Sequence, residues 1–392
     1  MINIFLIMIF FVFMLNIVFF LFAIVVIIFL FSWIFYKFAS LLLVCFIMKT
    51  KILISIIVSL VASAVCAQDV CYSLKRIWGD GSTHCAFTSL VEHKGRYYCA
   101  FREGFSHIFN EKGEADGKIH IISSSDGDKW ETETVLSRTG YDLRDPKLSV
   151  TPKGELMVLM GCSLYKGGKL ESTSTLVSFS KNGKKFSIPK PVNISSSASQ
   201  NFAWLWRVTW HKGTGYGVAY FKAGDQNKLE LLATKNGTEY EVMKTFDISG
   251  YPNETTVRFD ADDRMLLFVR RESGNRSAML LSSSAPYTDW KQKELGFFCG
   301  GPDAYVFPDG GVLLGGREIH IPSRPKTMIY AGTADGNFQE MLMLPSFDDN
   351  SYPSFLKVGG EMWITYYSGH ETVKPSVFLA KVPLSLFNMI RK

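Results

Sequence analysis

The chain has 392 residues, of which 47% are hydrophobic, 14% are aromatic and 20% are charged. This composition excludes intrinsic disorder and collagen-like repetition, because so many aromatic side chains cannot stay solvated in an open chain. The net charge is only +6 and no run of Lys and Arg stands out, so nucleic acid is excluded as the expected partner.

The first 50 residues are almost free of charge, with Lys37 and Lys49 as the charged ones. An apolar run of this length is typical of a membrane helix. A genuine membrane anchor within residues 1–47 is therefore one interpretation of this segment.

A second pattern follows directly. Residues 48–67 have the basic start, apolar middle and small-residue end of a signal peptide, with cleavage expected after Ala67. Because a signal peptide works only at the start of a chain, we prefer Met48 as the true start. Residues 1–47 are then an extension outside the mature protein. Under either interpretation residues 68–392 are exported, so we expect a secreted or periplasmic protein, with membrane anchoring as the alternative.

Five of the seven cysteines lie beyond residue 67, an odd number at wide spacings without a C-x-x-C pair. We therefore expect buried free thiols rather than a disulfide framework or a zinc site. The sequence predicts no metal and no cofactor, and we expect a monomer.

A polar box recurs along the chain. Each full copy has Ser or Thr, then Asp or Asn, then Gly, and ends on an aromatic residue. This is the chemistry of a tight turn, in which Asp or Asn bonds its own backbone and Gly takes positive φ. Full copies begin at Ser124, Ser180 and Thr234, a shorter copy begins at Thr333, and a degenerate copy begins at Ser282.

Six hairpins of apolar strand, Gly or Asp turn and apolar strand interleave with these boxes. Long helical periodicity is missing. Six such units predict an all-β fold, a six-bladed β-propeller with four-stranded blades in one domain over residues 68–392. The strand Cys71–Trp78 is expected to close the sixth blade. The hairpin turns fall at residues 93–95, 152–154, 211–213, 261–263, 308–310 and 358–360.

In a propeller, the start of each inner strand and the end of each second strand meet at one face near the axis, where ligands bind. Clustered guanidiniums there suit an anionic ligand, aromatic rings can stack on sugars, and paired acids serve acid/base chemistry. The sequence places these arginines and aromatic residues at those points: Arg102, Arg144, Arg207, Arg270, Arg317, Trp204, Trp206, Tyr366 and Tyr367.

Over roughly residues 71–385, the boxes and the six units resemble the sialidases. Glu254 begins an inner strand and Arg270 follows sixteen residues later, similar to the sialidase segment with a catalytic glutamate and one arginine of the carboxylate-binding triad. The segment around Tyr352, followed by Trp363–Tyr367, resembles the segment that holds the tyrosine nucleophile.

This resemblance implies an exo-glycosidase that releases a terminal acidic sugar, sialic acid by default, from a glycan or glycoconjugate. Tyr352 would attack the anomeric carbon and Glu254, within about 2.6–3.2 Å, would take its proton. Arg317 or Arg324 would supply the last triad arginine. The acid is expected on the loop after the first blade's second strand: Asp116 first, then Glu111, Glu114 and His107.

One part of the sialidase pattern is missing. The segment that should supply the first triad arginine is Ala86–Leu90 here, which contains no arginine. Arg102, Arg144 or Arg207 could replace it from nearby.

Two alternatives remain open. Arg144–Pro146 resembles the Arg-Asp-Pro motif of five-bladed glycosidases acting on fructans and arabinans, which makes Asp145 an alternative acid or transition-state stabiliser paired with Glu254 on another glycan. The other alternative is a non-catalytic glycan-binding propeller. Tyr352 together with Glu254 favours an enzyme, because binding alone needs no nucleophile and base.

Overall fold

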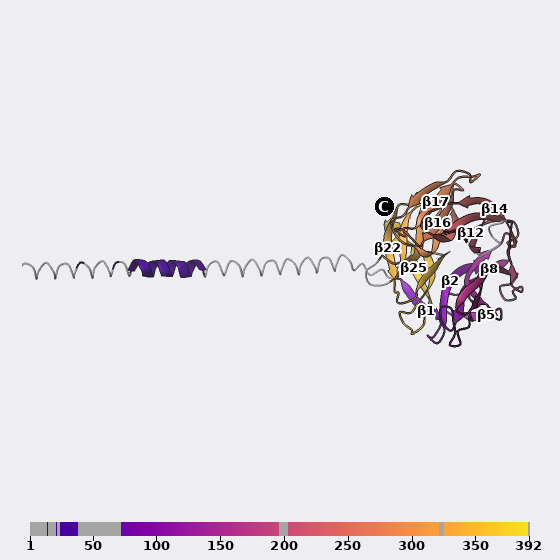
Figure 1. Cartoon of the computed structure of the whole chain (residues 1–392), viewed down its shortest axis with the longest axis horizontal. Coiled ribbons are helices and arrows are strands. Elements are labelled where there is room, and N and C mark those ends of the chain that lie inside the picture. Colours follow the sequence, from indigo (N-terminus) through magenta and orange to yellow (C-terminus); the bar gives the residue numbers. More distant parts are fainter. Residues whose placement is uncertain are drawn as a thin grey trace, which may run out of the picture. The chain divides into compact units, whose positions relative to one another are not determined.

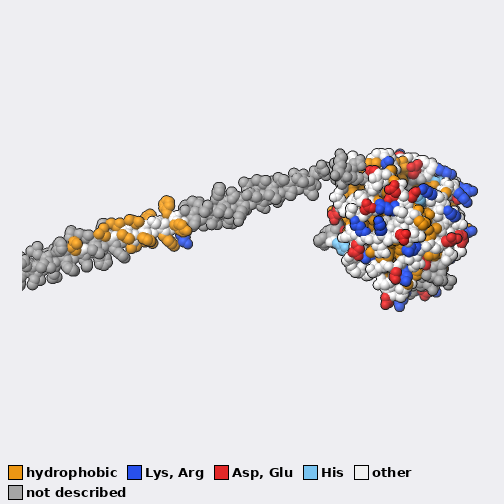
Figure 2. Space-filling model, turned by 90° about the horizontal axis from the view of Figure 1, so that it is seen from above, with side chains coloured by type: hydrophobic (Ala, Val, Ile, Leu, Met, Phe, Trp, Pro, Cys, Tyr) orange, Lys and Arg blue, Asp and Glu red, His pale blue; other side chains and the backbone are white. Residues whose placement is uncertain are grey.

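The structure, a computed structural model, describes residues 14, 21, 24–37, 72–195, 203–320 and 325–390. The chain divides into two compact units, residues 1–70 and residues 71–392, which are described separately. In the first unit, residues 24–37 are helical and expose apolar side chains (Figure 2). Across the described residues, no helix combines the length and the apolar character needed to cross a membrane. The expected signal peptide, residues 48–67, lies outside the described residues.

The second unit is an all-β, six-bladed β-propeller, as predicted. Figure 1 shows its strands arranged around a common centre, and they form six sheets within the described residues. Blades 1 and 2 contain β2 (His84–His93), β3 (Arg96–Gly104), β4 (Lys118–Ser124), β5 (Glu131–Leu136), and then β6 (Asp142–Val150), β7 (Leu156–Lys166), β8 (Lys169–Ser180) and β9 (Lys190–Pro191).

Blades 3 and 4 follow. They contain β11 (Trp204–His211), β12 (Thr214–Ala223), β13 (Gln226–Thr234), β14 (Glu239–Phe246), and then β15 (Pro252–Phe259), β16 (Met265–Arg271), β17 (Met279–Ser283) and β18 (Lys291–Glu294). Blade 3 has a fifth strand, β10 (Asn193–Ile194), which pairs in parallel with β14. The expectation of four strands in every blade is therefore wrong for this blade.

Blades 5 and 6 complete the ring. They contain β19 (Gly300–Val306), β20 (Gly311–Glu318), β21 (Lys326–Thr333), β22 (Phe338–Leu344), and then β23 (Ser351–Val358), β24 (Glu361–Ser368) and β25 (Ser376–Pro383). The outer strand of blade 6 is β1 (Ser73–Trp78), which pairs antiparallel with β25 and lies beside it in Figure 1. The prediction that the beginning of the propeller segment closes the last blade is confirmed. A short helix, α2 (Leu384–Ile390), follows β25.

The core is built between consecutive blades. One cluster joins Ile121 of β4 to Val158 of β7, and another joins Leu231 of β13 to Leu267 of β16. Strand residues alternate between the two faces of a sheet, so each blade supplies apolar side chains to both neighbours. The four cysteines that the structure describes are buried free thiols, as predicted.

The polar boxes form turns between the third and fourth strands. In the first box, Asp126 Oδ1 accepts hydrogen bonds from the backbone amides of Asp128 and Lys129, and Ser124 Oγ accepts one from Gly127 N at 2.8 Å. Gly127 has φ +75° and lies against the Trp363 ring of blade 6, leaving no room for a Cβ. Each such turn therefore also fits one blade onto the preceding one.

A β-bulge interrupts every inner strand close to its first residue. At each bulge, two inner-strand residues lie opposite one residue of the second strand. A bulge re-aims side chains, so these pairs project from a common level around the axis. The pairs are Phe87–Thr88, Asp145–Pro146, Trp206–Arg207, Asn253–Glu254, Gly301–Pro302 and Tyr352–Pro353.

Candidate active site

Two of the bulges bring Tyr352 and Glu254 into direct contact. The Tyr352 hydroxyl donates a hydrogen bond to Glu254 Oε1 at 2.7 Å, within the expected reach. The other carboxylate oxygen accepts from Arg270 Nη1 at 2.6 Å and from Gly301 N at 2.9 Å. Arg270 Nη1 also lies 3.0 Å from the Tyr352 hydroxyl oxygen. A phenol, a carboxylate and a guanidinium thus share one hydrogen-bonded unit.

The protonation states of this pair follow from its surroundings. Burial raises the pKa of Glu254, but the charge of Arg270 and the hydrogen bond from Tyr352 bring its net pKa below the usual value. Burial and the Glu254 charge hold the pKa of Tyr352 well above its usual value. At neutral pH the pair is therefore a neutral phenol facing an ionised carboxylate, the state in which Glu254 can accept the phenolic proton.

Arg317, at the end of β20, is the second guanidinium beside Tyr352. Its Cζ lies 5.7 Å from the centroid of the Tyr352 ring. Its Nη2 donates to Asp349 Oδ1 at 2.7 Å and to the Tyr367 hydroxyl at 2.8 Å. Arg270 and Arg317 end the second strands of neighbouring blades, so both present their charge to the same side of the propeller.

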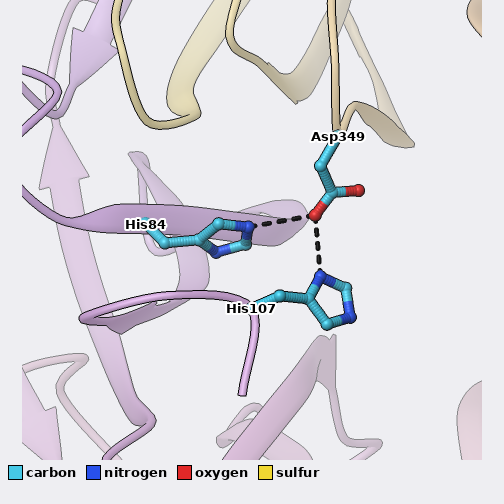
Figure 3. Close-up of side chains that lie close together, drawn as sticks. All are labelled: His84, His107 and Asp349. Carbon is cyan, nitrogen blue, oxygen red and sulfur yellow. Dashed lines mark hydrogen bonds and ion pairs between the residues drawn. The ribbon is translucent and has the colours of Figure 1, made fainter. Parts of the chain in front are cut away.

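Asp349, just before β23, joins residues from three blades. Its Oδ2 lies 3.0 Å from His84 Nε2 and 2.8 Å from His107 Nδ1 (Figure 3). Its Oδ1 accepts from Arg317 and, at 2.8 Å, from the Tyr367 hydroxyl. Burial raises the pKa of Asp349, but the two histidines and Arg317 outweigh it and hold that pKa well below the usual value.

His84, His107 and Asp349 also form the group, among the described residues, whose donor atoms lie close enough to share a metal ion. Its charge environment does not favour a cation. Arg317 already bonds the carboxylate, and Arg144 Nη2 lies 3.1 Å from His107 Nε2, where a metal-bound histidine usually donates to a carboxylate or carbonyl. A divalent ion would be placed next to two guanidiniums, so we interpret the group as a hydrogen-bonded network.

Asp145 lies on the bulge of the inner strand of blade 2, and Arg144 directly precedes it. Asp145 is buried, its Oδ2 is 3.9 Å from Arg144 Nε, and its Oδ1 has no hydrogen-bond partner among the described residues. Burial is the main cause that raises the pKa of Asp145, with Arg144 acting against it. The Arg144 guanidinium is itself close to the network of Asp349 through His107.

Several predicted ligand-binding residues are not available to a ligand. Arg102 is 0% exposed and bonds Asp142, because its guanidinium fills the interior between blades 1 and 2. Arg207 is buried in an ion pair with Asp303 at 3.1 Å. Both predictions of a ligand-binding role are therefore corrected to a structural role. Arg324 lies outside the described residues.

Two of the aromatic residues predicted to bind the sugar are also buried. Trp206 is 1% exposed and meets the Tyr352 ring edge-on at 6.3 Å, so it supports that ring rather than stacking on a sugar. Tyr367 is also buried, with its hydroxyl on Asp349. The half-buried rings beside this cluster are Trp204 and Tyr220, which lie parallel with centroids 6.3 Å apart.

The expected acid, Asp116, bonds the backbone of its own loop. Both of its carboxylate oxygens accept from Phe105 N at 3.2 Å, which fixes the loop. Glu114 is exposed and accepts from Asn110. His107 is the residue of this loop that reaches the site. Asp349 was not predicted, although its place three residues before Tyr352 was an available signal.

The chain matches no family model, and no curated protein is similar to it in sequence. Solved structures are similar to it in fold. A protein of unknown function from Dyadobacter fermentans has a TM-score of 0.69 and 17% identity, covering 79% of this chain and 97% of that one. An alpha-L-arabinanase of Penicillium chrysogenum, complexed with arabinobiose, has a TM-score of 0.61 and 14% identity over 80% and 99%.

A sialidase of Trypanosoma rangeli, in complex with the inhibitor DANA, has a TM-score of 0.63 and 12% identity. The match covers 82% of this chain but only 61% of the sialidase chain. These structural neighbours include glycoside hydrolases with propeller folds, and the low identities show a shared fold alone.

Proposed function

We propose that the protein is an exo-glycosidase that hydrolyses a terminal acidic sugar from a glycan, with Tyr352 as nucleophile and Glu254 as its base. The contact of 2.7 Å between the Tyr352 hydroxyl and the Glu254 carboxylate carries this proposal. A glycan-binding protein has no need of a phenol held against an ionised carboxylate. The glycosidases among the structural neighbours support a carbohydrate substrate.

The charge of the site supports an acidic sugar. Arg270 and Arg317 flank Tyr352, and guanidiniums bind carboxylates through paired hydrogen bonds. Arg144 is the best replacement for the missing first arginine, because its guanidinium contacts His107 of the same network. Sialic acid is the default substrate by resemblance to the sialidases.

The chemistry would proceed in two displacements. The Tyr352 oxygen attacks the anomeric carbon while its proton passes to Glu254 Oε1, and the bond to the leaving oxygen breaks. A neutral phenol can approach a carbon flanked by a carboxylate, whereas a charged nucleophile would be repelled. Arg270, which contacts both oxygens, stabilises the phenolate character that returns when water releases the sugar.

Asp145 supports a second candidate, a glycosidase acting on a different glycan through the carboxyl groups of Asp145 and Glu254. The surroundings raise the pKa of Asp145 and lower that of Glu254. Two carboxyl groups with separated pKa values are typical of an acid and a base or nucleophile. The similarity in fold to an arabinanase agrees with this candidate.

A substrate screen followed by two variants tests both candidates. The protein is assayed on 4-methylumbelliferyl glycosides that include the sialoside, and Tyr352→Phe and Asp145→Asn are then compared on the best substrate. We expect Tyr352→Phe to lower kcat by roughly a thousandfold or more, because the attacking oxygen is lost. Tyr305→Phe, on an inner strand with its ring against Phe307, is the control and should keep full activity.

One pattern of activities would contradict the tyrosine mechanism. If Tyr352→Phe keeps near wild-type turnover while Asp145→Asn abolishes it, the paired-carboxylate candidate replaces the tyrosine mechanism. Binding of a glycan without turnover of any glycoside would favour the non-catalytic propeller.

We also propose that the protein is exported through the signal peptide at residues 48–67, with a mature chain that begins at Gln68. The apolar middle and the small residues before Gln68 support this site. N-terminal sequencing of the exported protein checks it. A sequence that begins before Met48 would support the membrane anchor instead.

A further inference from the structure

The proposed mechanism needs a group that protonates the leaving oxygen, and the loop between β3 and β4 brings one titratable side chain to the site. Asp116 bonds Phe105 N and Glu114 bonds Asn110, whereas His107 reaches Asp349 and Arg144. We propose that His107, positioned by Asp349, donates the proton to the leaving group and takes it back from the hydrolytic water. This inference rests on the proposed function.

Asp349 fixes which nitrogen of His107 exchanges the proton. The carboxylate is acceptor-only and receives donors on both oxygens, so the bond of 2.8 Å to His107 requires a proton on Nδ1. Arg144 is also a donor, and its Nη2 lies 3.1 Å from Nε2. Nε2 therefore carries the lone pair, and it is the atom that can gain and lose a proton while Nδ1–H stays on Asp349. Figure 3 shows the ring held in this way, with Nδ1 toward the carboxylate.

His107 is also on the side of the site where a leaving group departs. Its side chain is 48% exposed, whereas Tyr352 is 7% exposed. The Phe87 ring contacts both, with centroids 5.4 Å from His107 and 4.9 Å from Tyr352. A sugar held above Tyr352 would thus have the nucleophile on its buried side and His107 toward solvent.

Charges of opposite sign lie on the two sides of the His107 ring, Asp349 at Nδ1 and Arg144 at Nε2. Asp349 stabilises an imidazolium, as a carboxylate does for the histidine of a catalytic triad, but Arg144 opposes it. A sugar carboxylate beside Arg144 would offset that repulsion.

The proton balance closes over the two displacements. In the first, the bond from Tyr352 to the anomeric carbon forms, the bond to the leaving oxygen breaks, the phenolic proton goes to Glu254 and the Nε2 proton of His107 goes to the leaving oxygen. In the second, water attacks the carbon and gives its proton to His107 Nε2. The Tyr352 oxygen leaves and recovers its proton from Glu254. Nε2, which takes up a proton from solvent before the first displacement, again carries a proton after the second and returns it to solvent when the site empties.

The test compares leaving groups. A 4-methylumbelliferyl glycoside of the acidic sugar needs little help from an acid, whereas the same sugar linked to a second sugar needs a proton. His107→Asn retains an N–H donor for Asp349 but removes Nε2. We expect it to lower kcat/KM for the sugar-linked substrate by about 10²–10⁴-fold and for the aryl glycoside by less than about tenfold. Retained aryl hydrolysis also shows that the variant is folded.

Two further variants sharpen the comparison. Asp349→Asn should give the same selective loss, because Asp349 acts by holding the His107 ring. His211→Asn removes another histidine–aspartate pair, which joins the end of β11 to Asp263 in the turn between β15 and β16, and should leave both substrates unaffected.

Three results would overturn the inference. If His107→Asn slows both substrates equally, or neither, His107 is not the proton donor although the tyrosine mechanism stands. Activity that is lost in EDTA and restored by Zn²⁺ would place a metal ion at His84, His107 and Asp349 instead. Failure of the wild-type protein to cleave either acidic glycoside would remove the proposed function itself, and this inference with it.

Discussion

At the scale of single residues, the buried amine of Lys147 lies beside Tyr352 and makes no hydrogen bond among the described residues. It is 2% exposed, and its Nζ has no hydrogen-bond partner among the described residues. It lies 4.8 Å from the centroid of the Trp206 ring and 5.7 Å from that of Tyr352. Burial lowers the pKa of Lys147 to about 8, with Arg207 adding to the effect. Its charge is thus held near the aromatic ring of Tyr352 at a cost in stability.

The difference in free energy of unfolding between Lys147→Met and wild type should therefore depend on pH. A lysine with a lowered pKa in the folded state binds fewer protons there than in the unfolded chain, so wild-type stability rises between about pH 8 and the unfolded pKa near 10.4. The variant lacks this rise. We expect it to be as stable as wild type or more stable at pH 7, because an apolar side chain replaces an unpaired buried charge. Its relative stability should fall by about 2 kcal/mol by pH 9.5.

Urea unfolding at pH 7 and pH 9.5 measures this change. Lys153→Met, at the exposed turn between β6 and β7, is the control and should show no such dependence. A stability difference for Lys147→Met that is the same at both pH values would contradict the assignment of a buried, titrating amine.

The residues of the site differ in how far the sequence could predict them. Tyr352, Glu254 and Arg270 lie in short segments with recognisable patterns, and the structure brings them together. Arg102 was misplaced because sequence position puts it at the end of a second strand but does not show that its side chain turns inward to Asp142. Asp349 contacts residues from distant parts of the chain, and no local sequence pattern predicts such a contact.

At the scale of elements, the turns formed by the polar boxes pack against the preceding blade. In the box at Ser124, Gly127 combines a left-handed backbone with close contact to the Trp363 ring. The turn at Gly154, between β6 and β7, has almost the same φ, +74°, but nothing lies within 4 Å of where a Cβ would be. Substitution of Gly154 by alanine therefore measures the free-energy cost of the left-handed backbone alone. The same substitution at Gly127 adds the cost of overlap with the Trp363 ring.

We expect Gly154→Ala to lower the free energy of unfolding by about 1–2 kcal/mol, the cost of a left-handed residue with a side chain. Gly127→Ala should cost about 2–5 kcal/mol, because the methyl group also overlaps the Trp363 ring. Chemical unfolding of both variants against wild type gives the two values. Equal losses would mean that the box does not join blade 1 to blade 6.

The hairpins and boxes were predictable because a turn depends on neighbouring residues: Gly, Asp and Asn allow positive φ wherever they occur. The bulges were not. Phe87, Asp145 and Tyr352 take positive φ at the bulges although none is glycine. Tertiary packing holds this backbone conformation, so the local sequence does not predict it. The short strand β10 was missed for a similar reason, since it forms only by pairing with β14.

At the scale of the whole molecule, the ring is closed by β1, which joins the start of the propeller to its last blade. Ile77 of β1 packs in the cluster that contains Trp363, Val377 and Leu379. Without β1, the backbone groups of β25 on that side would be unpaired and Ile77 would leave this cluster. An exposed strand edge is also a template for aggregation. Closure thus protects the blade that carries Tyr352.

Removal of β1 should therefore destabilise the propeller beyond the loss of a few residues. We compare a chain that starts at residue 72 with one that starts at residue 80. We expect the shorter chain to lose at least about 2 kcal/mol, because burial of Ile77 alone is worth about 1.5–3 kcal/mol and the ladder with β25 is lost as well. It should also aggregate at lower protein concentration. Chemical unfolding and light scattering measure these two effects.

A peptide can then show whether the loss belongs to the missing strand. A peptide with the sequence of residues 72–79 should add back to the free edge of β25, since a sheet edge binds an extended strand through backbone hydrogen bonds. It should raise the unfolding midpoint of the shorter chain and reduce its aggregation, and a scrambled peptide of the same composition should do neither. Two chains of equal stability, or equal effects of the two peptides, would mean that blade 6 holds together through β23, β24 and β25 alone. Because Tyr352 is the second residue of β23, a closed blade 6 also predicts that the matching peptide, and not the scrambled one, restores the proposed glycosidase activity along with stability.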